Sequence, residues 1–148
     1  MYRVELSHNF ETAHRLGTES SPPKCQSIHG HSWWVTVRLE GPRLDSDGIL
    51  VEFGAFKKAL RAWLDGEVDH ALLLKKGDPV AAALRAVVPT MRIVELDENP
   101  TTEVIAAWIF HRCAEILHNE LGVPRETAKV VNVHVQETRV NAASYSGA

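Results

Sequence analysis

Alternating apolar and polar side chains open the chain. Over residues 2–14 and again over residues 29–40, side chains of one kind recur at every second position. Because successive side chains of a strand point to opposite faces, this period predicts two half-buried β-strands. Residues 15–28 contain Gly, Ser and Pro, so we predict a loop between the strands. The expected inward faces carry Val4, Leu6, His8, Phe10, Thr12 and His14 in the first strand, and His31, Trp33, Val35, Val37 and Leu39 in the second.

Helical spacing replaces the alternation in the middle of the chain. Apolar side chains at intervals of three and four predict a helix over residues 53–64, which we expect Gly66 to end. A second, longer helix is predicted to begin at Asn99-Pro100-Thr101-Thr102-Glu103 and to run to Gly122. The other assignments are an irregular segment at 65–78, a short helix at 79–88 and strands at 90–96, 129–137 and 142–145.

Strands at both ends of the chain, with helices between them, are typical of an α+β fold. We therefore expect a single domain over residues 1–148, built as one antiparallel β-sheet with helices packed on one face.

Three histidines fall on the expected inward faces of the first two strands. His29 and His31 are two residues apart, so their imidazoles leave the same face, and Gly30 between them has no side chain. An antiparallel return of the chain would bring His14 alongside them. Three imidazoles without a fourth protein ligand are typical of an open, catalytic zinc site. Cys25, four residues before His29, is a nearby nucleophile or base.

The charge balance favours a small-molecule partner. The chain has 16 basic and 19 acidic side chains and a net charge of −3, so we expect neither nucleic acid nor an anionic membrane as a partner. No apolar run approaches the length of a membrane span, and no apolar signal segment follows Met1, so we expect a cytoplasmic protein. Cys25 and Cys113 are then expected to be free thiols.

Five short segments, in this order, are similar to those of a known enzyme family. They are Phe10-Glu11-Thr12-Ala13-His14-Arg15-Leu16, Cys25-Gln26-Ser27-Ile28-His29-Gly30-His31, Val68-Asp69-His70, Asn99-Pro100-Thr101-Thr102-Glu103 and Glu137-Thr138. Over nearly its whole length the chain resembles the 6-pyruvoyltetrahydropterin and 6-carboxytetrahydropterin synthases. The three-residue gap between Cys25 and His29 is similar to the carboxy branch, which serves queuosine and other deazapurine pathways. The resemblance implies the tunnelling fold, or T-fold.

The resemblance also implies a role for each residue of the matching segments. His14, His29 and His31 would bind Zn²⁺, and Cys25 would act as the base, although a free cysteine is more often an inert small residue. Asp69 and His70 would form a proton relay, where a solvated turn pair is the ordinary alternative.

The acidic side chains of the last two segments would bind the substrate. Glu137 would bind the pterin ring, where the ordinary alternative is a solvated strand end. Glu103 would be a second substrate contact, although acidic residues are favoured in a first helical turn. Thr102 is foremost a capping residue, with a lesser expectation of pterin contact.

The implied reaction is zinc-dependent conversion of 7,8-dihydroneopterin triphosphate into 6-carboxy-5,6,7,8-tetrahydropterin, with loss of triphosphate and acetaldehyde. The alternatives are the pyruvoyl synthase reaction on the same substrate and a catalytically silent pterin- or purine-binding T-fold protein. The family also implies a homo-oligomer, a tetramer or hexamer, with active sites at subunit interfaces. Trp34 points away from the expected core and is a candidate interface residue.

Overall fold

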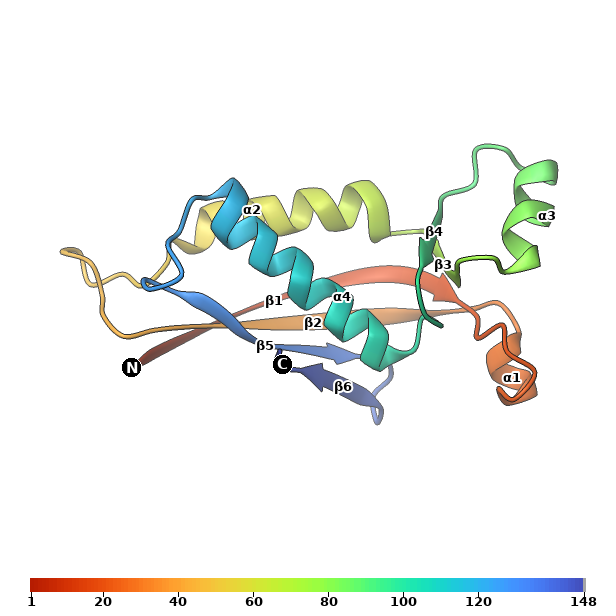
Figure 1. Ribbon diagram of the computed structural model, residues 1–148, viewed down its shortest axis with the longest axis horizontal. Coiled ribbons are helices and arrows are strands. Elements are labelled where there is room, and N and C mark those ends of the chain that lie inside the picture. Colours follow the sequence, from red (N-terminus) through yellow and green to blue (C-terminus); the bar gives the residue numbers. More distant parts are fainter. Residues whose placement is uncertain (148) are drawn as a thin grey trace.

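The structure is a computed structural model that describes residues 1–147. One long sheet and two long helices make up most of it (Figure 1). The elements are β1 (Tyr2–His14), α1 (Pro23–Gln26), β2 (His29–Gly41), α2 (Phe53–Trp63), η1 (Leu64–Val68), β3 (Leu72–Lys75), α3 (Pro79–Val87), β4 (Ile93–Leu96), α4 (Thr102–Glu115), η2 (Ile116–Glu120), β5 (Lys129–Gln136) and β6 (Ala142–Tyr145).

The six strands form one sheet in the order β4-β3-β1-β2-β5-β6. The longest ladder is the antiparallel pair β1 and β2, which runs from Tyr2 opposite Gly41 to His14 opposite His29. β5 continues the antiparallel part beside β2, and β6 pairs with β5. The predicted alternation of the first two strands is confirmed, because their even-numbered and odd-numbered positions respectively face the core.

The sheet is mixed, so the expectation of a purely antiparallel sheet is wrong. β3 pairs with β1 in parallel, and β4 pairs with β3 in parallel. The segment predicted to be irregular contains β3, whose first three residues are all buried. Such a strand lacks the alternation that marks a half-buried one, because both of its faces are covered. The short helix α3 joins β3 to β4.

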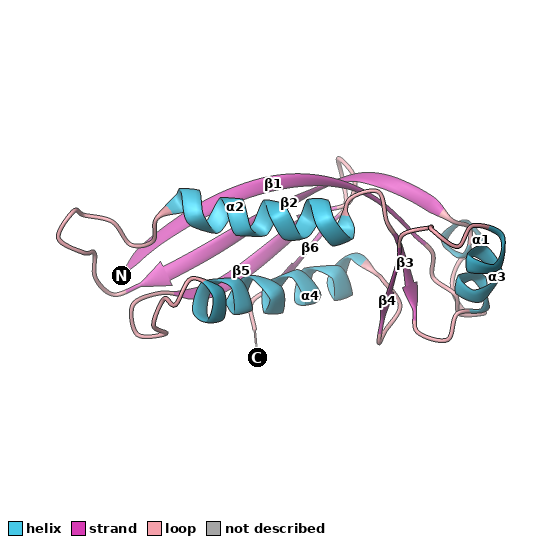
Figure 2. Cartoon of the chain, turned by 90° about the horizontal axis from the view of Figure 1, so that it is seen from above, coloured by secondary structure: helices cyan, strands magenta, loops and turns pink. Residues whose placement is uncertain are grey.

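Helices α2 and α4 lie side by side over one face of the sheet (Figure 2). Their apolar side chains pack with the inward faces of β1, β2 and β5 in the principal core. Phe56 and Leu60 of α2, and Ile105 and Ile109 of α4, have no exposed surface. The predicted layer of helices on one face of the sheet is therefore confirmed.

The ends of the helices are set by capping side chains and by wide terminal turns. The carboxylate of Glu52 accepts hydrogen bonds from the N–H groups of Gly54 and Ala55 at the start of α2. Gly66 does not end this helix, contrary to the prediction, because the chain continues through the π-helical turn η1 to Val68. Within residues 1–147, no helix has the length and apolar composition needed to cross a bilayer.

Candidate metal centre

The register between β1 and β2 brings the three predicted histidines together. His14 lies directly opposite His29, and Thr12 lies opposite His31. One nitrogen atom from each of His14, His29 and His31 lies within 4.8 Å of the other two. The ring centroids are 4.6 to 5.2 Å apart. The convergence predicted from the shared strand face is thus present in the fold.

Backbone carbonyl groups orient two of these imidazoles. Nδ1 of His14 lies 2.7 Å from the carbonyl oxygen of Pro100, and Nδ1 of His29 lies 2.7 Å from that of Ser27. A carbonyl oxygen only accepts, so Nδ1 must donate in both cases and Nε2 keeps its lone pair. This second hydrogen bond is the usual support of a metal-binding histidine.

The Nε2 atoms of His14 and His31 are buried and have no hydrogen-bond partner within the described chain. Burial is the largest cause that lowers the pKa of His14, and it likewise lowers the pKa of His31. The neutral imidazole is the form that binds a metal ion, and an unpaired buried nitrogen is costly without a ligand. The donor set therefore fits a divalent cation such as Zn²⁺.

Trp33 forms a rigid wall behind the histidines. Its ring centroid lies 5.2 Å from that of His14 and 5.1 Å from that of His31. Its indole N–H donates to the carbonyl oxygen of Thr12 at 3.0 Å, and Phe10 stacks parallel to it at 6.0 Å. Because Trp33 is fully buried, it limits the rotation of the two imidazoles that it contacts.

A cavity of about 190 Å³ opens beside the histidines. Two of the predicted ligands, His14 and His29, line it. Four other predicted site residues line it as well: Cys25, Thr102, Glu103 and Glu137. Thr102 Oγ1 donates to Glu137 Oε2 at 2.5 Å, and Glu137 Oε1 lies 3.8 Å from Nε2 of His31. The lining residues are His14, Leu16, Cys25, His29, Thr101, Thr102, Glu103 and Glu137.

Asp69 and His70 do not line this cavity. His70 borders a separate hollow, to which His31 and several residues from the solvent-facing side of β1 and β2 also contribute. Nδ1 of His70 donates to Asp69 Oδ2 at 2.6 Å, so the predicted pair does form. The His70 side chain is 79% exposed. Within one chain, His70 and Cys25 therefore line different hollows.

The main chain of β1 fixes the Asp69–His70 turn. Asp69 Oδ1 accepts from the N–H of Glu11 at 2.7 Å, and the N–H of His70 donates to the carbonyl of Glu11 at 2.6 Å. His70 has a φ of 58°, which is uncommon for a residue with a side chain. Burial alone would raise the pKa of Asp69, but the hydrogen bonds from Glu11 and His70, with the charge of Arg92, hold it below its usual value.

Sequence reasoning missed the groups that hydrogen-bond to the site residues and orient them. The carbonyls of Pro100 and Ser27 carry no sequence signal, because any residue supplies a carbonyl. Arg92 Nη1 donates to the carbonyl oxygens of Asp65 and Asp69, both at 2.8 Å. Its distance of 23 residues from Asp69 along the chain leaves no local pattern to identify it.

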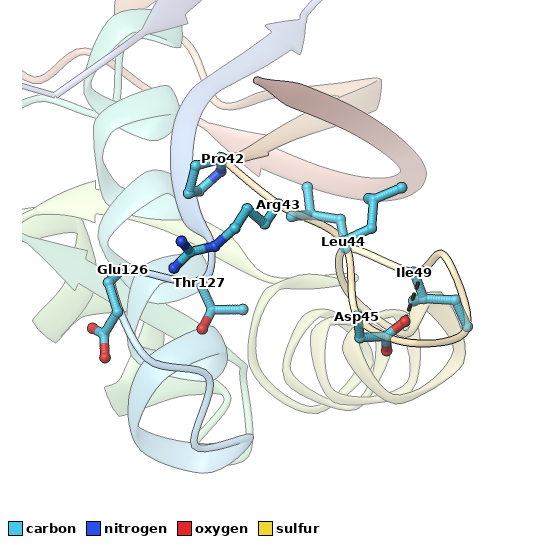
Figure 3. A pocket seen from close by; sticks show the side chains of 8 residues that line it. Pro42, Arg43, Leu44, Asp45, Ile49, Glu126 and Thr127 are labelled. Atoms are coloured by element: carbon cyan, nitrogen blue, oxygen red, sulfur yellow. Dashed lines mark hydrogen bonds between the residues drawn. The ribbon is translucent and has the colours of Figure 1, made fainter.

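A further hollow of about 260 Å³ lies at the opposite end of the sheet, beyond the last residue of β2 (Figure 3). It contains no histidine or cysteine, and Asp45 Oδ1 is already bound by the N–H groups of Asp47 and Ile49 in its own loop. The hollow therefore lacks the convergent ligands of the histidine cluster. It is lined by Pro42, Arg43, Leu44, Asp45, Ile49, Leu50, Glu126 and Thr127.

Comparison with known proteins shows the family to which the chain belongs. A sequence profile of the family described as 6-pyruvoyl tetrahydropterin synthase matches residues 3–148. The chain belongs to this family. Relatives in the family include the 6-carboxy-5,6,7,8-tetrahydropterin synthase of Rickettsia bellii, 31% identical over 66% of this chain and 69% of the relative. The enzyme of the same name from a Synechocystis species is 30% identical over 98% of this chain and 93% of its own.

The family's solved structures share the fold. The 6-pyruvoyl tetrahydropterin synthase of Caenorhabditis elegans superposes with a TM-score of 0.68, covering 99% of this chain and 96% of its own at 23% identity. The predicted T-fold is therefore confirmed, with a mixed sheet in place of the antiparallel one. The family resemblance expected from the five sequence segments is confirmed as well.

Proposed function

We propose that the protein is a zinc-dependent 6-carboxy-5,6,7,8-tetrahydropterin synthase acting on 7,8-dihydroneopterin triphosphate, with loss of triphosphate and acetaldehyde. The observation that carries this proposal is the single cavity in which a thiol and two carboxylates meet two members of the histidine cluster. Relatives with full-length coverage that bear this name support the carboxy product.

His14, His29 and His31 would hold the zinc ion, through Nε2 where Nδ1 is occupied by a carbonyl. Bound zinc is a Lewis acid that polarises the oxygen atoms it contacts and makes neighbouring protons easier to remove. Its place beside the cavity wall would bring that effect to the hydroxylated side chain of the substrate. The rest of the chemistry falls to this chain's own side chains.

Cys25 would be the base that removes a proton from the substrate side chain. It is partly exposed, and it lines the same cavity as His14 and His29. A thiol beside a cation is readily converted to the thiolate, which accepts a proton at neutral pH. The geometry thus supports the role that the family resemblance implies.

His70, held by Asp69, would supply or accept the second proton. Since His70 borders a hollow other than the one that Cys25 lines, we propose that this step uses His70 from an adjacent copy of the chain in a homo-oligomer, a tetramer or hexamer. Trp34 lies on the same face of β2 as Ser32, which lines that hollow, and it is 53% exposed. A large exposed indole at this position supports an interface on this face of the sheet.

Glu137 and Glu103 would recognise the pterin ring. A carboxylate presents two acceptor oxygens, which match the paired N–H donors on one edge of a pterin. We assign the ring to Glu137, whose Oε2 is oriented by Thr102, and a second contact to Glu103. Both carboxylates lie in the cavity wall. Substrate-sized ligands that lack the pterin donors should therefore bind poorly.

The decisive experiment is incubation of the purified, zinc-loaded protein with dihydroneopterin triphosphate, followed by mass identification of the product. We expect 6-carboxytetrahydropterin and acetaldehyde. The pyruvoyl product would favour the second candidate, which the family description supports. Bound zinc and pterin without any turnover would instead indicate a silent binding protein.

Two pairs of variants test the residue roles. Cys25→Ala should bind zinc but lose at least ~100-fold in turnover, the usual effect of removing a general base, whereas the buried Cys113→Ala should not. Nearly normal turnover of Cys25→Ala would contradict its role.

For the ring contacts, Glu137→Gln and Glu103→Gln are titrated with a non-reacting pterin. Loss of one charged acceptor should weaken binding by roughly 2–3 kcal/mol in Glu137→Gln and by less in Glu103→Gln. Unchanged pterin affinity in Glu137→Gln, with a large loss of affinity in Glu103→Gln, would show that Glu103 and not Glu137 recognises the ring.

A further inference from the structure

A buried ion pair lies behind the loop that carries Cys25. Nη1 of Arg15 donates to Oδ1 of Asp78 at 2.6 Å, and the two side chains are 15% and 2% exposed. Neither side chain belongs to the cavity lining. Charged groups are rarely buried this deeply without a partner, and a buried pair by itself contributes little net stability. Its location therefore calls for a reason other than the stability of the fold.

Three consecutive carbonyl groups of the Cys25 loop each accept a hydrogen bond. The carbonyl of Cys25 accepts from the N–H of Leu16 at 2.8 Å, and that of Gln26 accepts from Nε of Arg15 at 2.8 Å. The third, that of Ser27, is the group that orients His29. The short segment that holds the thiol is thus fixed at successive peptide groups, one of them by a charged side chain.

Asp78 is itself held in place at its other contacts. It is the N-cap of α3, where its Oδ1 accepts from the N–H of Val80 at 3.0 Å. Gly17 lies so close to it that an added Cβ would stand 2.5 Å from Asp78 Oδ2. Arg15 therefore connects a fixed point on α3 to the main chain immediately after Cys25.

We propose that Arg15 is a positioning residue whose guanidinium, fixed by Asp78, holds the Gln26 carbonyl and thereby sets the Cys25 thiol in the cavity wall. The catalytic consequence of this arrangement rests on the proposed function, in which Cys25 is the base. The planar guanidinium donates in two directions at once, from Nε and from Nη1. A lysine keeps the charge but has a single ammonium group, so it cannot reproduce both contacts with the same geometry.

Alkylation of the native, metal-loaded protein with iodoacetamide, followed by mass spectrometry of the Cys25 peptide, tests the proposal. Arg15→Lys and Asp78→Asn should each raise the rate of Cys25 alkylation by about tenfold or more, since a lost hydrogen bond to a charged group shifts local opening by that factor. Turnover in Arg15→Lys should show kcat lowered by about tenfold or more, with KM within about twofold, because a displaced base affects the reaction more than binding.

Two internal comparisons sharpen the result. Arg85→Lys alters an ion pair of similar length, between Arg85 and Glu95, whose hydrogen bond does not involve the Cys25 loop, so both rates should match the wild type. Cys113 is fully buried and should stay unlabelled in every variant that keeps its fold.

Cys25 alkylation within twofold of wild type in both Arg15→Lys and Asp78→Asn would overturn the proposal. Labelling of Cys113 as fast as Cys25 in these two variants would also overturn the proposal. The ion pair would then stabilise the whole fold and not the position of one loop. Full turnover in Cys25→Ala would remove the base role but leave the alkylation result standing, so the two proposals fail separately.

Discussion

Replacement of His29 by alanine tests the metal centre with the least disturbance of the fold. His29 is half-buried at the first residue of β2, and its hydrogen bond reaches only Ser27. Its loss should lower the unfolding free energy of the metal-free protein by about 1 kcal/mol or less. His14 is a poorer choice, because it is 3% exposed and holds the Pro100 carbonyl. Its removal would cost about 2–4 kcal/mol even without metal.

Zinc should stabilise the wild type by an amount set by its binding. A ligand present at about 100 times its Kd adds about 2.7 kcal/mol to the unfolding free energy when it binds only the folded state. For a domain of 148 residues, each kcal/mol corresponds to about 2–4 °C in Tm, so zinc should raise Tm by about 5–11 °C. His29→Ala should retain almost none of this increase.

The assay is thermal unfolding, followed by near-ultraviolet circular dichroism, with zinc and with a chelator. His134→Ala is the matched control, because His134 on β5 bonds to Ser144 on β6 and lies outside the histidine cluster. That variant should keep the full zinc-dependent increase. If His29→Ala is stabilised by zinc as much as the wild type, or if His134→Ala loses the increase, the three-histidine assignment is wrong.

Three further results are expected from the described contacts. Gly41→Ala should lower the unfolding free energy by about 1–3 kcal/mol, because the added Cβ would overlap the carbonyl oxygen of Thr127. Gly66→Ala has open space around the added Cβ and should raise the unfolding free energy by up to about 1 kcal/mol. Urea denaturation measures both changes. The pKa of Asp69 in the folded state lies below its usual 3.8. The ionised carboxylate therefore stabilises the fold above pH 3.8, and this contribution is lost as the pH falls through the folded-state pKa. The difference in unfolding free energy between wild type and Asp69→Asn should be constant near neutral pH and shrink below about pH 4. Burial raises the pKa of the Cys113 thiol far above its usual range, so native protein should resist alkylation there up to about pH 10 and react once denatured.

The half-buried strands and the convergence of the three histidines could be predicted because each depends on a period of two. The alternation placed His14 and His31 on inward faces, and the antiparallel ladder then fixed which residues meet. Only local geometry was needed for this step. β6 was predicted with its observed bounds, Ala142–Tyr145, and β5 to within one residue.

The parallel part of the sheet could not be predicted in the same way. β3 is an apolar run without alternation, and such a run does not reveal which strand it will join. Gly66 suggested a helix end, but the last turn widens into η1 and tolerates it. These outcomes depend on tertiary contacts between segments that are far apart in the sequence.

The groups that orient the site side chains could not be predicted from the sequence either, because they also come from distant segments or from the backbone. Two imidazoles are oriented by the carbonyls of Pro100 and Ser27, which any residue could provide. The position of His70 was also hidden, since its sequence neighbourhood says nothing of which side of the sheet it will lie on. The five family segments predict a set of chemical groups but do not place those groups in space.

β1 is the element that joins the two halves of this chemistry. Through its antiparallel ladder with β2 it brings His14 opposite His29, on the face that α2 and α4 cover. At Glu11, three residues earlier, its main chain binds both Asp69 and His70. One continuous strand therefore carries His14 of the histidine cluster and binds the Asp69–His70 pair, and any displacement of its last four residues would move both. In a homo-oligomer, the same rigidity would let each chain hold its own histidine cluster while presenting His70 at a constant position to a neighbour.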